Sequence, residues 1–238
     1  MQANLGIKGF IPTSLVDWPG KICSVLFMGG CNFRCPACHN HRLVLGPESL
    51  PEIPLEETLA YLRSRAQWID GVTVTGGEPT LRKSLLHVLR ALKDKGVRTK
   101  LDTNGSNPGV LGNLLRMGLV DAVFMDVKAP LHVRRYRAVA GVPVDLACIE
   151  ESIDLLLASP IEVTFRTTVI PGMVEEPQLA EIRRRLGSAR RFVVQPFRGS
   201  DTLDAAMASR DEFDMGRIDH MKRCFEVDPG PAAYPVAV

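Results

Sequence analysis

Residues 22–40 read ICSVLFMGGCNFRCPACHN, a short apolar run followed by two glycines and three closely spaced cysteines. The apolar and β-branched residues of this run predict a buried strand over 22–28. Reactive side chains that directly follow a buried strand indicate chemistry at the carboxyl end of that strand. The rest of the chain repeats this order, with a strand and then a polar loop.

Five further apolar runs predict strands, and apolar residues at helical spacing lie between them. Strands that alternate with helices imply parallel pairing and right-handed crossovers. An open doubly wound sheet and a partial barrel both fit, and we predict an α/β fold, a partial (β/α)6 TIM-type barrel. The predicted strands are 22–28, 72–75, 97–102, 122–127, 162–170 and 192–196, and the predicted helices are 55–66, 81–92, 146–157 and segments that begin at Asn107-Pro108 and after Pro177.

No repeat, low-complexity tract or linker divides the 238 residues. We therefore expect residues 1–238 to form a single domain, with a core over about 20–198 and a C-terminal extension over 199–238.

The composition is that of a globular protein with a sizeable core, being 45% hydrophobic and 24% charged. Lys and Arg total 29 against 27 Asp and Glu, so the charge balance does not favour a nucleic-acid partner. No apolar run approaches the ~20 residues needed to span a bilayer, and the first residues lack a secretory pattern. We expect a cytoplasmic protein with no membrane partner, in which cysteines stay reduced.

Polar and glycine residues follow every predicted strand. Because the carboxyl ends of parallel strands meet at one rim, this placement predicts an active site there. The residues concerned are the cysteine loop, Gly76-Gly77-Glu78-Pro79, Asp102-Thr103-Asn104-Gly105, Asp126-Val127-Lys128, Arg166 with Thr168 on the fifth strand, and Gln195 to Arg198.

The cysteines Cys31, Cys35 and Cys38 have the spacing C-x3-C-x2-C. Three thiolates on one loop suit a cubane iron–sulfur cluster that leaves one iron open to another ligand. The alternative is a structural zinc ion with His39 or His41 as fourth ligand.

The other strand ends indicate a ligand with both an amine and a carboxylate. Two glycines at 76–77 allow close approach to the backbone, and the Glu78 carboxylate can accept from an amine. Asp126 and Lys128 are two residues apart and so share one face of a strand.

Taken together, C-x3-C-x2-C and the GGEP at 76–79 resemble the radical S-adenosylmethionine (SAM) enzymes. The LDTNG at 101–105, the DVK at 126–128, TSLVDWPGK at 13–21, CHN at 38–40 and FRTTVIPG at 165–172 resemble the activators of glycyl-radical enzymes, and most closely those of anaerobic ribonucleotide reductase. The resemblance covers residues from about 8 to about 198.

The resemblance implies that Cys31, Cys35 and Cys38 hold a [4Fe–4S] cluster whose fourth iron is chelated by SAM. Reductive cleavage of SAM would then yield a radical that abstracts hydrogen from a glycine of a partner enzyme. It also implies a monovalent cation near Asp102, Thr103 and Asp126, and a flavodoxin or ferredoxin as electron donor. The cofactor-binding residues would be Gly76, Gly77, Glu78, Pro79, Asp102, Thr103, Asn104, Asp126, Lys128 and Arg166.

Two positions depart from the family pattern. Ala37 stands where most members have an aromatic residue that contacts adenine, which leaves Phe33 or His39 for that contact. Arg198 stands where pyruvate formate-lyase activators have histidine, which favours a reductase partner. A small-molecule or peptide-modifying radical SAM enzyme, such as a 7-carboxy-7-deazaguanine synthase, and a non-catalytic zinc- or cluster-binding module are the alternatives.

Overall fold

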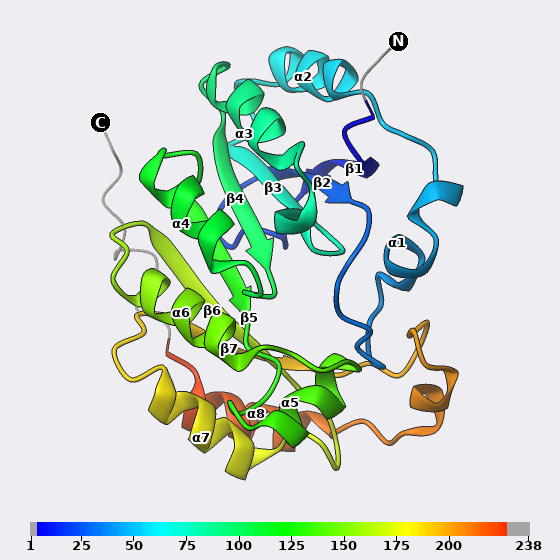
Figure 1. The fold of residues 1–238 in the computed structure, drawn as a ribbon, viewed down its shortest axis with the longest axis vertical. Helices are drawn as coiled ribbons and strands as arrows, with labels where there is room; N and C mark the ends of the chain where they lie inside the picture. Colours follow the sequence, from blue (N-terminus) through cyan, green and yellow to red (C-terminus); the bar gives the residue numbers. More distant parts are fainter. Residues whose placement is uncertain (1–3, 228–238) are drawn as a thin grey trace. The chain divides into compact units, whose positions relative to one another are not determined.

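A computed structural model describes residues 4–227 of the chain (Figure 1). These residues divide into two compact units: unit 1 contains residues up to 32 together with 40–103 and 109–123, and unit 2 contains 33–39, 104–108 and the residues from 124 onward. The expectation of a single domain stays a prediction.

The described residues form seven strands in one sheet, in the order β1-β2-β3-β4-β5-β6-β7. All six predicted strands are present, and β2 with β3, β3 with β4 and β6 with β7 pair in parallel. The strands are β1 (Ile7–Ser14), β2 (Cys23–Met28), β3 (Gly71–Gly76), β4 (Arg98–Thr103), β5 (Ala122–Asp126), β6 (Glu162–Val169) and β7 (Phe192–Pro196).

Strand β1 was not predicted. It pairs antiparallel with β2, from Ile7 opposite Met28 to Ser14 opposite Cys23, and the register shifts twice along it. Gly9 and Pro12 interrupt its sequence. Both residue types are depleted in strands, and proline is tolerated at sheet edges and bulges, so the pattern lacks a strand signal although the strand forms.

The helices cover the predicted segments and add three that were not predicted, α1, α5 and α8. The predicted helix over 81–92 begins later than expected, because Pro79 lies in a separate 3-10 turn and α3 begins at Leu85. The helices are α1 (His41–Leu45), α2 (Leu55–Ser64), α3 (Leu85–Lys93), α4 (Pro108–Arg116), α5 (Val133–Ala140), α6 (Leu146–Leu157), α7 (Glu176–Arg185) and α8 (Met215–Phe225), with 3-10 turns η1 (Pro47–Ser49), η2 (Pro79–Leu81) and η3 (Ala205–Ser209).

Each unit has its own apolar core. In unit 1, α3 packs on β4 through one face, with Leu85, Leu89 and Leu92 buried. In unit 2, α8 packs on β7 and α7, with Ile218 and Met221 buried. Burial of this apolar surface stabilises the strands whose ends carry the polar loops. Across residues 4–227, no helix is long and apolar enough to cross a bilayer.

Candidate active site

The turn after β3 lies against the end of β2 in unit 1. The Gly77 N–H donates to the Met28 carbonyl (2.8 Å), and the Glu78 N–H donates to the Gly30 carbonyl (2.8 Å). Gly76 has φ +122°, which L side chains rarely adopt, and a Cβ on Gly77 would lie 2.0 Å from the Gly30 carbonyl oxygen. Only glycine therefore permits this close approach of two strand ends.

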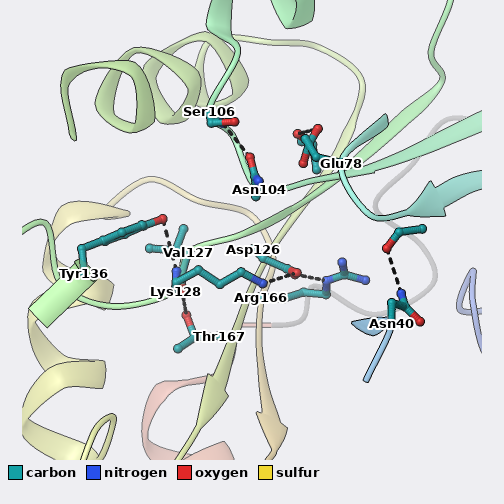
Figure 2. A network of polar contacts seen from close by, with 12 residues as sticks. Asn40, Glu78, Asn104, Ser106, Asp126, Val127, Lys128, Tyr136, Arg166 and Thr167 are labelled. Carbon is teal, nitrogen blue, oxygen red and sulfur yellow. Dashed lines mark hydrogen bonds and ion pairs between the residues drawn. The ribbon is translucent and has the colours of Figure 1, made fainter. Parts of the chain in front are cut away.

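Glu78 is buried, with 1% of its surface exposed. Its Oε1 accepts hydrogen bonds from the Thr80 N–H (3.1 Å), the Thr80 hydroxyl (2.5 Å) and the Thr103 hydroxyl (2.8 Å). The carboxylate thus joins the turn after β3 to the last residue of β4, and Figure 2 shows it beside the strand end. A carboxylate held in this way is fixed in orientation before any ligand arrives.

We expect Glu78→Ala to destabilise the protein by about 2–3 kcal/mol, because the donors of Thr80 and Thr103 lose a buried acceptor. Glu78→Gln keeps an acceptor oxygen and should lose less than half of that amount. Urea unfolding of both variants without cofactor measures the difference. Equal losses in the two variants would contradict this account of the carboxylate.

Asp102, at the end of β4, has a partner that was not predicted. Its Oδ1 forms an ion pair with the ammonium group of Lys100, and the side chains of Lys100 and Asp102 are 0% and 13% exposed. Two residues of one strand separated by a single position share a face, so the pair follows from strand geometry.

Unit 2 contains a second charged group, formed at the end of β5 and within β6 (Figure 2). Arg166 Nε donates to Asp126 Oδ1 (2.7 Å), and Lys128 Nζ donates to Asp126 Oδ2 (2.9 Å). The exposed fractions of the three side chains lie between 17% and 28%. The structure therefore brings together three residues that the sequence analysis assigned to the site.

Charge pairing dominates the titration of this group. Burial acts to raise the pKa of Asp126, but the charges and hydrogen bonds of Arg166 and Lys128 hold it well below its usual value. Burial acts to lower the pKa of Lys128, but the charge of the Asp126 carboxylate outweighs burial, so the pKa of Lys128 lies above its usual value. Asp126 and Lys128 are both ionised throughout the physiological pH range.

The depressed Asp126 pKa predicts an acid-dependent contribution to stability. The unfolded aspartate titrates near pH ~3.9, so the stabilisation is fully present above about pH 5 and is lost as the pH falls through the native pKa. Asp126→Asn should therefore cost about 2 kcal/mol at pH 7 and much less at about pH 2, nearer the native pKa. Urea unfolding at both pH values measures it.

Asp154→Asn is the control for this prediction, because Asp154 pairs with Arg185 on an exposed helix surface. Its loss should stay below about 0.5 kcal/mol at either pH. A loss for Asp126→Asn that does not change with pH would show that the ion pairs do not stabilise the native state.

Tyr136 on α5 is a site neighbour that the sequence analysis missed. It is fully buried, and its hydroxyl accepts from the Lys128 N–H (3.4 Å). Burial raises its pKa well above the usual value for tyrosine. Phe33 packs edge-on against it, with ring centroids 6.5 Å apart. The arginines around Tyr136 indicate a solvated helix face. The only sequence signal for the contact between Tyr136 and Lys128 is the opposite, apolar face of α5.

The cysteine loop is held from one side by the end of α5. The Arg34 N–H donates to the Ala140 carbonyl (2.9 Å). A Cβ on Gly141, which has φ +74°, would lie 1.9 Å from the Arg34 carbonyl oxygen. Within the loop, the Cys38 N–H donates to the Cys35 carbonyl (3.0 Å). Burial raises the pKa of the Cys35 thiol, and the positive charge of Lys128 opposes that shift.

A segment of the C-terminal extension holds the same loop. The Leu203 N–H donates to the Cys38 carbonyl (2.9 Å), and the Asp204 N–H donates to the Pro36 carbonyl (3.0 Å). His39 Nε2 lies 3.0 Å from the Arg198 carbonyl oxygen. Residues 198–204 thus support the second half of the cysteine loop.

The structure places the predicted residues in two sets. Among residues 4–227, no group of three or more His, Cys, Asp or Glu side chains is arranged to hold a metal ion, so the joint role of the three cysteines stays a prediction. Unit 1 contains Cys31, Gly76, Gly77, Glu78, Pro79, Asp102 and Thr103, and unit 2 contains Cys35, Cys38, Asn104, Asp126, Lys128 and Arg166.

The sequence pattern of the radical SAM superfamily matches residues 25–183. The chain belongs to this superfamily. A protein of Methanocaldococcus jannaschii named as a candidate glycyl-radical enzyme activating enzyme is 30% identical, over 83% of this chain and 82% of its own. The pyruvate formate-lyase 1-activating enzyme of Escherichia coli K12 is 29% identical over 80% of each chain. Within the radical SAM superfamily, the chain therefore belongs to the activating-enzyme group.

Solved structures of radical SAM proteins have a similar fold. TYW1 with a lysine–pyruvate adduct bound has a TM-score of 0.62 at 15% identity and covers 85% of this chain and 72% of its own. Streptococcus suis SuiB bound to S-adenosylmethionine has a TM-score of 0.62 at 15% identity and covers 82% of this chain and 44% of its own. This likeness confirms the predicted fold class, a partial TIM-type barrel with mostly parallel strands.

A [4Fe–4S] cluster and SAM are the cofactors of this family, and the donor groups of the residues present suit both in their chemistry. Cys31, Cys35 and Cys38 form no disulfide bond and are half-buried rather than enclosed, and three thiolates suit a cubane cluster with one open iron. At the Gly76-Gly77 turn, the Glu78 carboxylate is fixed in orientation by Thr80 and Thr103, and a carboxylate suits the amine of SAM.

Proposed function

We propose that the chain is a radical SAM activase that generates a glycyl radical on anaerobic ribonucleotide reductase. Membership of the activating-enzyme group carries the proposal, and the residues at the strand ends of each unit support it. The cluster ligands would be Cys31, Cys35 and Cys38. When bound, the cluster supplies the electron that cleaves the sulfonium of SAM and so gives a 5′-deoxyadenosyl radical.

The chain's own residues would bind and orient SAM. The Gly76-Gly77 backbone and the Glu78 carboxylate would receive its amino group, because Glu78 is already fixed by Thr80 and Thr103. Pro79 begins the 3-10 turn that keeps Thr80 under that carboxylate. Fixed acceptors cost no reorganisation when the ligand binds.

In unit 2, Lys128 and Arg166 would attract the anionic and hydroxyl parts of SAM. Both cations are held by Asp126, so their positions are set before binding. Asn104 Oδ1 accepts from the Ser106 N–H (2.9 Å), which fixes the loop after β4 (Figure 2).

The choice of the reductase as partner rests on sequence. The segments TSLVDWPGK and FRTTVIPG resemble the reductase activators, and Arg198 replaces the histidine of pyruvate formate-lyase activators. Arg198 Nη1 donates to Glu212 Oε2 (2.6 Å), so this position carries a charged pair instead. Pyruvate formate-lyase is the second candidate partner, because the Escherichia coli relative is named for it.

We further propose a cytoplasmic location and a flavodoxin or ferredoxin as electron donor. The near-equal numbers of basic and acidic residues, 29 and 27, support neither a nucleic-acid nor a membrane partner.

The first test uses anaerobically purified protein reconstituted with iron and sulfide. Dithionite and SAM are added, and 5′-deoxyadenosine is measured together with the electron paramagnetic resonance spectrum of the cluster. We expect a spectrum that changes on SAM addition and formation of 5′-deoxyadenosine. A colourless protein that holds zinc and forms none would favour the binding module.

The second test identifies the partner. The activated protein is mixed separately with anaerobic ribonucleotide reductase and with pyruvate formate-lyase from the same genome. We expect the resonance signal of a glycyl radical on the reductase only. A signal on pyruvate formate-lyase alone would reassign the partner, and 5′-deoxyadenosine without a signal on either would favour a small-molecule or peptide substrate.

A further inference from the structure

Lys100 is the only lysine or arginine that is buried among residues 4–227. It lies in the middle of β4, opposite Thr73 of β3 in the parallel register. Thr73 in turn contacts the buried thiol of Cys23, with Oγ1 and Sγ 3.6 Å apart. The Lys100 side chain is therefore on the same face of the sheet as Thr73 and Cys23, and it is fully buried.

A buried ammonium group needs an anionic partner, because desolvation of an unpaired charge is costly. That partner is Asp102, whose Oδ1 forms an ion pair with Lys100 Nζ. Asp102 is also a residue that the family resemblance assigns to a monovalent cation. The negative charge of Asp102, which such a metal ion would compensate, is thus already compensated by the ammonium group of Lys100.

Asp126, the other carboxylate assigned to that cation, is also compensated. Its two oxygens accept from Arg166 (2.7 Å) and Lys128 (2.9 Å), as Figure 2 shows. Two positive groups therefore face one carboxylate in unit 2, and one positive group faces one carboxylate in unit 1. Neither unit leaves an uncompensated negative charge on these aspartates to attract a metal ion.

We propose that Lys100 is the internal counter-ion of Asp102 and that this protein binds SAM without a monovalent metal cation. Lys100 is a positioning residue, since it acts through Asp102. The proposal deepens the proposed function and rests on it, because it takes Asp102 to be part of the SAM site.

The test measures SAM binding by equilibrium dialysis to the reconstituted protein. One buffer contains tetramethylammonium as its only added cation. The others are the same buffer with K⁺ or Na⁺ added. For the unaltered protein, we expect the dissociation constant to change by less than about twofold between buffers. For Lys100→Met, we expect binding at least about tenfold weaker in tetramethylammonium and largely restored by K⁺ or Na⁺.

Three controls separate the counter-ion role from general damage. Lys83→Met removes an exposed lysine and should leave SAM binding unchanged in every buffer. The double variant Lys100→Met/Asp102→Asn removes both charges and should bind SAM with no response to K⁺. Thermal unfolding of cofactor-free Lys100→Met should shift upward with K⁺ or Na⁺, whereas that of the unaltered protein should not.

The outcomes distinguish the two proposals. The counter-ion proposal would be overturned if the unaltered protein bound SAM at least about fivefold more tightly with K⁺. It would also be overturned if Lys100→Met weakened SAM binding equally in all buffers. Unaltered, cluster-loaded protein that fails to bind SAM in any buffer would overturn the proposed function instead. If Lys100→Met does not fold, the unaltered protein and the double variant still decide the question.

Discussion

Replacing Cys35 with alanine is expected to abolish both the iron–sulfur cluster and the formation of 5′-deoxyadenosine. The cluster carries the electron-transfer chemistry, and a cubane with three protein thiolates cannot be held firmly by two. The rate of 5′-deoxyadenosine formation should fall by at least about three orders of magnitude. Iron content, visible absorbance and product are measured on the same anaerobic preparation. Cys31→Ala and Cys38→Ala should behave alike.

Cys224→Ala is the matched control. Cys224 is an exposed thiol on α8, with its Sγ 3.6 Å from His220 Nε2. Its removal should leave iron content and product unchanged. If Cys35→Ala kept a full complement of iron and formed product, the assignment of the triplet as cluster ligands would be wrong.

Gly77→Ala is expected to disrupt the site while leaving every polar side chain in place. The new Cβ would lie 2.0 Å from the Gly30 carbonyl oxygen. The Cβ is attached rigidly to the backbone and the atom that it meets is a backbone oxygen, so no side-chain rotation relieves the contact and the ends of β2 and β3 must separate. We expect a loss of about 3 kcal/mol in the free energy of unfolding and a loss of SAM binding in the variant that still folds. Urea unfolding and equilibrium dialysis measure the two effects.

Gly109→Ala tests whether the destabilisation comes from the close backbone contact at Gly77 or from any exchange of glycine for alanine. Gly109 lies in α4, and a Cβ there would meet nothing within 4 Å. Alanine is the better helix former, so the variant should be unchanged or more stable by about 0.5 kcal/mol. Equal destabilisation by both substitutions would contradict the close-approach argument.

The strands and the positions of the reactive loops could be predicted from sequence because they follow local patterns. An apolar run that ends in Gly-Gly-Cys identifies both β2 and the loop after it. Strand β1 could not be predicted in this way. Its pairing with β2 depends on contacts between chain segments, while Gly9 and Pro12 remove the local signal.

The site residues were predictable in kind, but their partners were not. Asp126 and Arg166 were both expected to face a ligand, and the structure pairs them with each other. The Thr103–Glu78 hydrogen bond joins residues 25 positions apart and depends on how β4 pairs with β3. Lys100 was missed because a lysine in a strand usually faces solvent. Its two-residue spacing from Asp102 was the signal that could have revealed it.

The support given to the cysteine loop by Leu203 and Asp204 has an evolutionary consequence. Both bonds are donated by main-chain N–H groups, which every residue except proline provides. Natural selection on these contacts would preserve the path of the chain and its length while side chains drift freely. The match to the family pattern ends at residue 183. Comparisons of side-chain identity are therefore a poor guide to segment 198–204, where a deletion or a proline would be far more harmful than an ordinary substitution.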